Sequence, residues 1–351
     1  MSRSAQPPLL GARLTAQLLA GEPARDPVAV AERLLAIQAQ DPRGARLAIR
    51  ARTHGTGTTA ADVDQALTNG RLLIAWLNRG TLHLVRREDW PWLHALTTPP
   101  LRTGNLRRLA QEGVPPEDAE RGVQAVQRAL ADEGPLTREQ LRERVDAVGV
   151  RTARQALVHI LMAATLRGLV VRGPMVGSRH AYVLVRDWLG EEATRAVDRD
   201  AALAELARRY LAGHGPASDR DLARWAGLPL RDARAGLTAI ASSLHERADG
   251  LVELADRADT PPAPLPPPRL LGTYEPLLLG WCSREDVLGA NTRVVTINGI
   301  FHPIALVRGR AVGIWRLTND KLALDPFDRV AQRDVAALRR DAANVARFLG
   351  S

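Results

Sequence analysis

The chain has 351 residues, of which 45% are hydrophobic and 25% are charged. This length and this balance predict a folded protein with two or more domains, and they exclude a long disordered chain. The formal net charge of +9 at pH 7 favours a polyanionic partner, either a nucleic acid or an acidic membrane surface. A surface rich in solvated arginine would give the same charge.

Lysine and cysteine are each present once. Because Lys321 is the only lysine, all but one of the 48 Lys and Arg residues are arginine, whose planar guanidinium suits bidentate phosphate contacts. The single cysteine, Cys282, excludes a disulfide framework within the chain and fits a reducing compartment. The first residues lack the apolar run of a signal peptide, and no stretch is long enough to span a bilayer. We therefore expect a cytoplasmic, nucleoid-associated protein without a membrane partner.

The first predicted elements are two helices and a strand. Apolar side chains recur at helical spacing over residues 27–37, with Asp26 placed as the N-cap and Pro27 at the first helical position. A second helix is predicted over residues 59–67, and the alternating pattern of residues 81–85 indicates a strand.

The order of helix, helix and strand returns twice further along the chain. Residues 134–149 predict a capped helix, residues 152–168 a longer apolar helix, and residues 169–185 a hairpin whose tip is "GPMVGSRH". Two more helices follow Gly215-Pro216 and end before the short strand "GLVEL". In both copies a Gly-Pro pair precedes a threonine or serine that is predicted to cap the next helix. Such an order is typical of the winged-helix variant of helix-turn-helix.

The last part of the chain has a different pattern. The proline-rich residues 260–270 predict an extended linker. Short strands punctuated by Asn298-Gly299 and Gly309-Arg310 then predict a small antiparallel sheet or barrel, and residues 332–348 predict a final helix. The predicted fold class is α+β and mainly helical, with tandem winged-helix units and a small antiparallel, barrel-like β domain at the C-terminus.

The predicted domains follow from these boundaries. Residues 1–125 are predicted to form an N-terminal winged-helix unit that carries the Gln-x-Gln sequence, and residues 126–198 a second unit with the basic hairpin. Residues 199–260 are predicted to form a third unit, and residues 261–351 contain the linker, the β domain and the final helix.

Several enzyme signatures are absent from the sequence. There is no P-loop, no dinucleotide-binding glycine pattern, no HExxH and no Gly-x-Ser-x-Gly elbow. The eight histidines are scattered, so neither a metal nor a cofactor is expected. Cys282 follows Trp281 without a base nearby in sequence, which favours a packed thiol over a nucleophile.

Two glutamines, Gln38 and Gln40, stand at the end of the first apolar run. On a regular helix these side chains would point to opposite sides, whereas in an extended segment they would share a face. Pro42 biases Asp41 away from helical geometry, so we expect the helix to end near Gln40 and an extended exit to bring the amides together. Neutral amides can orient a water molecule and a leaving group but cannot act as strong bases. Alternatively, both glutamines cap the helix end.

The motif "LLAIQAQDPRGARLAIRAR" together with "LNRGTLHLVRREDWPWLHALTTP" resembles the AlkZ-like winged-helix DNA glycosylases. This family includes resistance enzymes for DNA-alkylating antibiotics, and its catalytic signature is Gln-x-Gln. The resemblance continues through "LVHILMAATLRGLVVRGP", "GPASDRDLARWAGLPLRDAR" and "LLGTYEPLLLGW", and so covers nearly the whole chain.

The resemblance implies that Gln38 and Gln40 are the catalytic pair. It also implies a concave scaffold of winged helices that holds DNA, with the β domain completing the channel. A related branch has aspartate at the second motif position. Glutamine at position 40 therefore suggests the branch linked to bulky adducts and interstrand crosslinks.

The chemistry of alkylated purines agrees with neutral amides. Alkylation at N7 of guanine makes the base a cationic leaving group, so the enzyme need only position water and stabilise a cationic sugar, whereas an unmodified purine would need stronger acid catalysis. A lyase step through a Schiff base would need an amine of lowered pKa, and Lys321 lies between two aspartates that would keep it protonated.

We therefore expect a monofunctional DNA glycosylase that acts as a monomer on double-stranded DNA containing alkylated purines, in base excision repair or antibiotic resistance. The alternative is a non-catalytic winged-helix DNA-binding protein or transcriptional regulator. Three winged units without an obvious dimerisation helix argue against an ordinary dimeric repressor.

Candidate DNA contacts near the glutamines lie on a strand and a helix. Thr81 and His83 are two residues apart on the predicted strand, so they share a face and are expected near the lesion or its phosphate. The alternative is a strand packed on the first helix, with a core histidine. Arg43, Arg46 and Arg50 follow the glutamines and are candidates to line the same channel, or else to face water.

The predicted hairpin supplies a second group of candidates. Its tip is expected to hold Arg172, Arg179 and His180, and basic wings commonly contact phosphates or a minor groove. The alternative is a hairpin tip that is merely solvated.

Overall fold

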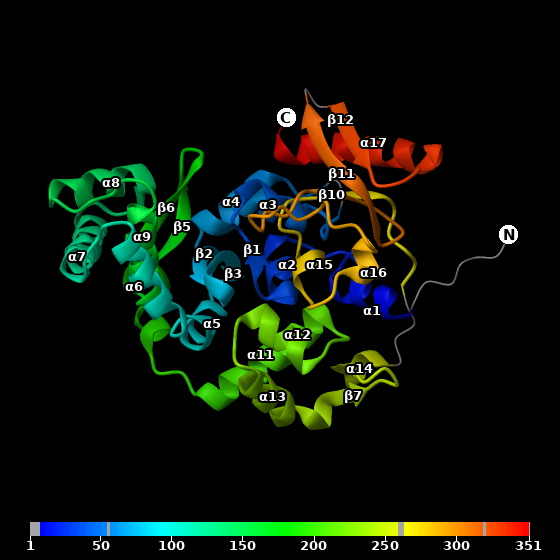
Figure 1. The fold of residues 1–351 in the computed structure, drawn as a ribbon, viewed down its shortest axis with the longest axis horizontal. Coiled ribbons are helices and arrows are strands. Elements are labelled where there is room, and N and C mark those ends of the chain that lie inside the picture. The colour runs from blue at the N-terminus through cyan, green and yellow to red at the C-terminus, as the bar shows by residue number, and fades with distance from the viewer. Residues whose placement is uncertain (1–7, 55–56, 259–262, 319–320, 351) are drawn as a thin grey trace. The chain divides into compact units, whose positions relative to one another are not determined.

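The computed structural model describes residues 8–54, 57–258, 263–318 and 321–350. Contacts between residues group the chain into two compact units (Figure 1). Unit 1 consists of Met1–Val63 and Leu203–Ser351, and unit 2 consists of Asp64–Ala202. The division of the chain into four domains stays a prediction.

Unit 1 begins with helices and a short strand, α1 (Pro8–Ala16), α2 (Pro27–Leu34), β1 (Ile37–Gln38) and α3 (Pro42–Arg50). As predicted, Asp26 caps α2, because its side chain accepts a 2.8 Å hydrogen bond from the backbone N–H of Ala29. The predicted end of this helix was wrong. The helix stops at Leu34, since Leu35 adopts a positive φ of 64°, and the buried apolar run continues as extended chain. A short apolar run fits a buried strand as well as a helix.

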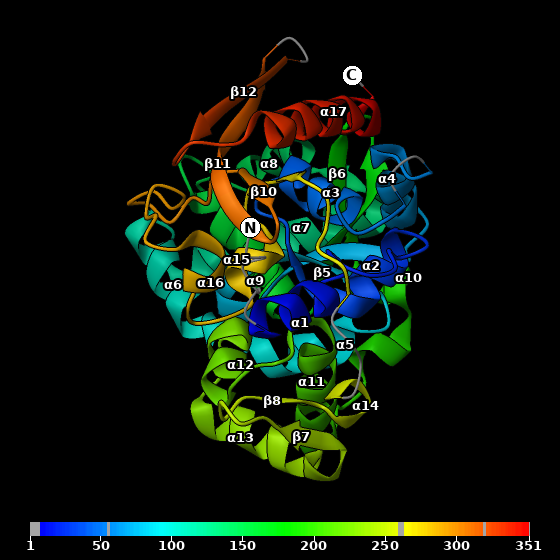
Figure 2. The same cartoon turned by 90° about the vertical axis from the view of Figure 1, so that its right-hand side faces the viewer.

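The second part of unit 1 contains the predicted third repeat, which is drawn in green and yellow-green in Figure 2. Its elements are α11 (Arg199–His214), which crosses the unit boundary, α12 (Asp219–Ala226), α13 (Leu230–Ala239), η3 (Ala241–Ser243), β7 (Leu244–Glu246), β8 (Val252–Leu254) and α14 (Ala255–Ala258). Ser218 caps α12 as predicted and forms a capping box with Asp221. Strands β7 and β8 pair antiparallel.

The C-terminal part of unit 1 is an antiparallel sheet with one long helix. The elements are β9 (Arg269–Leu271), α15 (Pro276–Leu279), α16 (Glu285–Leu288), β10 (Ile304–Val307), β11 (Arg310–Thr318), β12 (Lys321–Pro326) and α17 (Gln332–Leu349). The strand order is β12-β11-β10-β9, and α17 packs along β9 and β12 (Figures 1 and 2). Arg308 and Gly309, both with positive φ, form the two-residue turn of the β10–β11 hairpin.

This sheet corrects one prediction. Among the described residues, β9 and β12 are the edges of an open sheet, so the predicted barrel does not close. Part of the predicted proline-rich linker, residues 260–262, lies outside the described residues.

Unit 2 combines helices with strands that pair antiparallel. Its elements are α4 (Ala60–Thr68), which crosses the unit boundary, β2 (Leu72–Leu77), η1 (Asn78–Gly80), β3 (Thr81–Arg86), α5 (Trp90–Thr97), α6 (Leu101–Gln111), α7 (Pro116–Glu133), β4 (Leu136–Thr137), α8 (Arg138–Ala147), α9 (Ala156–Leu166), β5 (Val170–Val176), β6 (Arg179–Leu184), α10 (Val185–Leu189) and η2 (Glu191–Thr194). Within this unit the strands are hydrogen-bonded in the order β3-β2-β5-β6-β4.

The predicted sequence of capped helix, longer helix and hairpin is confirmed in unit 2. Thr137 caps α8 and forms a capping box with Gln140. The tip between β5 and β6 is Gly177-Ser178, since Val176 pairs with Arg179. The two-residue turn is therefore shorter than the eight-residue tip predicted from the sequence. No described helix is long and apolar enough to cross a membrane.

Candidate active site

The two glutamines lie on the non-helical segment between α2 and α3, in which Ile37 and Gln38 form β1 and Gln40 lies in a bend. Gln38 ends β1 and its side chain is 8% exposed, whereas Gln40 lies two residues further along and is exposed. The helical alternative for this segment is excluded, because α2 ends at Leu34.

Pro42 acts differently from the prediction. It does not end the first helix but occupies the first position of α3, where its missing N–H and fixed φ are favourable. Asp41 is the N-cap of α3, and its Oδ1 accepts a 3.0 Å hydrogen bond from the backbone N–H of Arg43. The other carboxylate oxygen accepts a hydrogen bond from the hydroxyl of Thr273. Asp41, the residue after Gln40, is thus hydrogen-bonded both to α3 and to the segment that follows β9.

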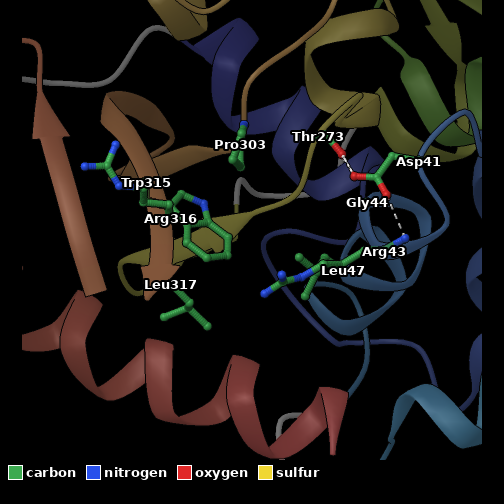
Figure 3. A pocket seen from close by; sticks show the side chains of 9 residues that line it. All are labelled: Asp41, Arg43, Gly44, Leu47, Thr273, Pro303, Trp315, Arg316 and Leu317. Carbon is green, nitrogen blue, oxygen red and sulfur yellow. Dashed lines mark hydrogen bonds between the residues drawn. The ribbon is translucent and has the colours of Figure 1, made fainter. Parts of the chain in front are cut away.

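A pocket of about 190 Å³ opens beside this helix start (Figure 3). Its lining residues come from α3 and its N-cap, the segment after β9, the residue before β10, and β11: Asp41, Arg43, Gly44, Leu47, Thr273, Pro303, Trp315, Arg316 and Leu317. In Figure 3 the guanidinium of Arg43 extends toward Trp315 and Leu317. Trp315 is held by a 2.9 Å hydrogen bond from its Nε1 to the carbonyl of Leu271. The pocket therefore combines apolar side chains with two arginines and one aspartate.

The other arginines of α3 have intramolecular partners. Arg46 is half-buried and donates a 2.9 Å hydrogen bond to the carbonyl oxygen of Pro42. Arg50 is buried and makes a bidentate ion pair with Asp341, with both N–O distances at 2.9 Å, and it also bonds the carbonyl of Leu270. Arg50 therefore does not face water, which corrects that alternative, and its place in a channel stays a prediction.

Thr81 and His83 lie on β3 of unit 2. Thr81 is half-buried, and its hydroxyl donates to the carbonyl of Asn78 at 3.3 Å. His83 is 2% exposed, with Nδ1 3.0 Å from the carbonyl oxygen of Thr81. Burial, followed by the positive charge of Arg79, lowers the pKa of His83 to about 3. A neutral, buried histidine favours the packing alternative at this position.

The hairpin candidates separate into a strand residue and tip residues. Arg172 is not at the tip, which corrects the prediction, but lies within β5 opposite Tyr182. Its Nε donates to the Tyr182 hydroxyl at 2.8 Å, and its guanidinium carbon lies 5.1 Å from the centroid of the Trp76 ring. Arg179 begins β6 and is exposed, and His180 next to it is half-buried.

Arg179 forms an ion pair with Glu139 at 2.6 Å, in which both side chains are more than half exposed. Exposed pairs of this kind contribute only about 0–1 kcal/mol. A phosphate can therefore replace the Glu139 carboxylate at little cost.

A family model described as AlkZ-like DNA glycosylase matches residues 31–348. The chain belongs to the AlkZ-like DNA glycosylase family. A curated relative of this family, the interstrand DNA cross-link repair glycosylase of Streptomyces sahachiroi, is 28% identical over 352 aligned residues, which are 94% of this chain and 93% of the relative. A solved structure, Streptomyces sahachiroi DNA glycosylase AlkZ, matches with a TM-score of 0.80 at 25% identity over 97% of this chain and 96% of that chain.

Three predictions are thereby confirmed: the AlkZ-like family, an α+β fold of helices with antiparallel sheets, and an enzyme that hydrolyses N-glycosyl bonds. The sequence reasoning missed some residues of the pocket, namely Thr273, Trp315 and Arg316. Thr273 lies in "LLGTYEPLLLGW", one of the stretches that resemble AlkZ-like sequences, so the resemblance marked the segment without indicating its role.

A buried ion pair holds the far end of α3 in this AlkZ-like chain. Arg52 and Glu275 have no exposed side-chain surface, and the distance between Nη2 and Oε1 is 2.5 Å. Arg52 also donates to the carbonyls of Gln17 and Ala48 and to the side-chain oxygen of Gln17. This arginine therefore has a structural role.

Within the described part of the chain, neither the lone thiol nor the possible metal ligands form a second reactive site. Burial, and then the carboxylate of Asp221, raise the pKa of the Cys282 thiol. A protonated thiol is a poor nucleophile, which argues against the nucleophile alternative. Cys282 is exposed, however, so the predicted packed thiol is wrong. Among the described residues, no three His, Cys, Asp or Glu side chains are grouped so that they could hold a metal ion.

Proposed function

We propose that this chain is a monofunctional DNA glycosylase that removes alkylated purines, in particular bulky N7-alkylguanine adducts and interstrand crosslinks, with Gln38 and Gln40 as the catalytic pair. The observation that carries the proposal is the non-helical Gln-x-Gln segment between α2 and α3, which is followed by Asp41 with its two hydrogen bonds. The name of the Streptomyces sahachiroi relative, a cross-link repair glycosylase, supports the crosslink substrate.

The proposed reaction needs no strong base. The bond between N9 of the base and C1′ of the sugar breaks, and its electrons neutralise the cationic alkylated base. Water oriented by the two amides forms the new bond at C1′ and loses a proton to the solvent. The products are a free alkylated base and an intact abasic strand.

The DNA-binding role is assigned to basic groups of each unit. In unit 1, Arg43 in the pocket and Arg46 on the next turn of α3 are proposed to contact phosphates near the lesion. In unit 2, Arg179 and His180 at the hairpin tip are proposed phosphate or minor-groove contacts, and Arg172 supports the hairpin through its contacts with Tyr182.

Thr81 and His83 of β3 in unit 2 complete the proposed set, with the half-buried Thr81 as a contact with the DNA and the buried His83 as a group that supports this strand from within. The helix-helix-hairpin orders support winged-helix units that bind double-stranded DNA, and we propose that the protein acts as a monomer.

The test uses a duplex with one defined N7-alkylguanine, incubated with excess enzyme, and detection of the released base by chromatography and mass spectrometry. We expect Gln38→Ala and Gln40→Ala each to lower the single-turnover excision rate roughly 10²-fold or more, as loss of a positioned hydrogen-bonding group does elsewhere. Duplex affinity and thermal midpoint should stay near those of the parent. The matched control is Gln65→Ala, since Gln65 is an exposed glutamine on α4.

The outcomes separate the possibilities. Full activity of either variant would remove that glutamine from the catalytic pair. Unfolding of both variants would support the helix-capping alternative. If the parent binds the duplex tightly but releases no base, the non-catalytic DNA-binding alternative is correct. A crosslinked duplex, resolved on a denaturing gel, tests unhooking in parallel.

A further inference from the structure

The segment Arg269–Glu275 contacts α3 from its N-cap, Asp41, to the residues just beyond its end. The contacts between the two segments include Thr273 with Asp41, Gly272 with Gly44, Leu270 with Arg50, and Glu275 with Arg52. Both segments belong to unit 1. The helix that begins directly after the Gln-x-Gln sequence is therefore fixed by residues more than 200 positions away.

The backbones approach most closely at the start of α3. A Cβ atom placed on Gly44 would collide with the hydroxyl of Thr273 and would lie 2.5 Å from its carbonyl oxygen. A Cβ atom placed on Gly272 would lie 3.0 Å from the Cα of Gly44. Only glycine at both positions permits this approach, which brings Thr273 within hydrogen-bonding distance of Asp41.

The Asp41 carboxylate connects two elements. Its Oδ1 accepts a hydrogen bond from the N–H of Arg43 in α3, whereas its Oδ2 accepts a hydrogen bond from Thr273 in the segment that follows β9. Gln40 is exposed and lies in a bend, where no strand or helix fixes its backbone. The backbone of Gln40 is therefore tied directly to Asp41, the anchored residue that follows it.

We propose that Thr273 is a positioning residue for the glycosylase reaction: its hydrogen bond to Asp41 fixes Gln40 in the orientation that catalysis requires. This inference rests on the proposed function of Gln40. In the proposed role Thr273 does not itself contact the substrate. Its effect is transmitted through one hydrogen bond and one peptide bond.

The size of the effect follows from the precision that positioned groups need. A displacement of about 1 Å can reduce a rate by about 10²-fold. Without the hydroxyl, Asp41 keeps its bond to Arg43, so the displacement should be smaller. We expect Thr273→Val to lower the maximal single-turnover rate by about 10-fold to 10²-fold, while the enzyme concentration for half-maximal rate changes by less than about 3-fold.

The experiment compares Thr273→Val with Thr273→Ser, which keeps the hydroxyl, on the N7-alkylguanine duplex. All rates are measured well below the lowest thermal midpoint of the set, so that unfolding does not contribute. Thr273→Ser should regain most of the parental rate. Thr103→Val is the control, because Thr103 is an exposed threonine on α6.

A double variant distinguishes positioning of Gln40 from a general loss of structure. In a Gln40→Ala background, whose residual rate is followed over long incubations, Thr273→Val should lower the rate by less than about 2-fold, since there is no amide left to position. An equal loss in both backgrounds would overturn the proposal, as would a Thr273→Val enzyme with the parental rate or a Thr273→Ser enzyme as slow as Thr273→Val.

The same set separates this inference from the proposed function. If Gln40→Ala alone retains the parental rate, the assignment of Gln40 fails, and the positioning role fails with it. If Gln40→Ala is slow and Thr273→Val is not, the catalytic assignment stands and only the role of Thr273 is wrong.

Discussion

The buried ion pair between Arg52 and Glu275 leads to a strong prediction about stability. In Arg52→Met, the hydrogen bonds to two carbonyls and to the Gln17 side chain disappear, and the Glu275 carboxylate loses its countercharge without any access to water. Its Oε1 would keep only the 3.2 Å bond from the N–H of Leu277, and its Oε2 already has no hydrogen-bond partner among the described residues.

The magnitude follows from these contacts. Removing one partner of a buried pair costs about 3–5 kcal/mol, because an uncompensated charge stays behind. At roughly 2–4 °C per kcal/mol for a protein of this size, the thermal midpoint should fall by about 6–20 °C. The assay is thermal unfolding followed by tryptophan fluorescence, since unit 1 contains Trp225, Trp281 and Trp315.

Two comparisons make the prediction refutable. The exposed pair Arg234–Asp219 is a control, and Arg234→Met should cost no more than about 1 kcal/mol. The double variant Arg52→Met with Glu275→Gln should be more stable than the sum of the two single losses predicts, because the stranded charge is gone. If Arg52→Met is no more destabilising than Arg234→Met, or if the two losses add, the pair is not the anchor described above.

The remaining predictions concern pH, salt and covalent chemistry. Since the pKa of His83 is about 3 in the folded protein and 6.5 ordinarily, the unfolded chain binds the extra proton and stability falls as the pH drops from 6.5 toward 3. When the pH is lowered from 6.5 to 5.0, the free energy of unfolding measured with urea should fall by roughly 1.5–2 kcal/mol less in His83→Asn than in the parent. Equal decreases in the two proteins would contradict a buried neutral imidazole. Arg179→Ala should reduce the slope of log binding constant against log salt concentration by about 0.9, the value for one phosphate contact on duplex DNA. An unchanged slope would show that the hairpin tip is not part of the DNA interface. Borohydride added during excision should trap no covalent protein–DNA adduct, and an adduct would show that an amine rather than water attacks C1′. Cys282→Ser should excise at the parental rate, and a slow variant would show that the thiol takes part.

The sequence alone determined the features that depend on neighbouring residues. The capping positions of Asp26, Thr137 and Ser218 were predicted correctly, because a cap is a contact between residues two or three apart. The β5–β6 hairpin and the final helix were predicted for the same reason, from turn residues and apolar periodicity. The Gln-x-Gln sequence, with the stretches around it, was enough to indicate the AlkZ-like family.

Only the tertiary structure decided which of several locally allowed states is occupied. The apolar run after Leu34 fits a helix or a strand, and its burial as extended chain is what places Gln38 and Gln40 outside any helix. Arg50 and Arg179 have the same chemistry, yet one is neutralised by Asp341 and the other remains at the surface. The bond between Asp41 and Thr273 spans 232 residues, and no local pattern predicts it, because it exists only where two glycines allow two distant backbones to touch.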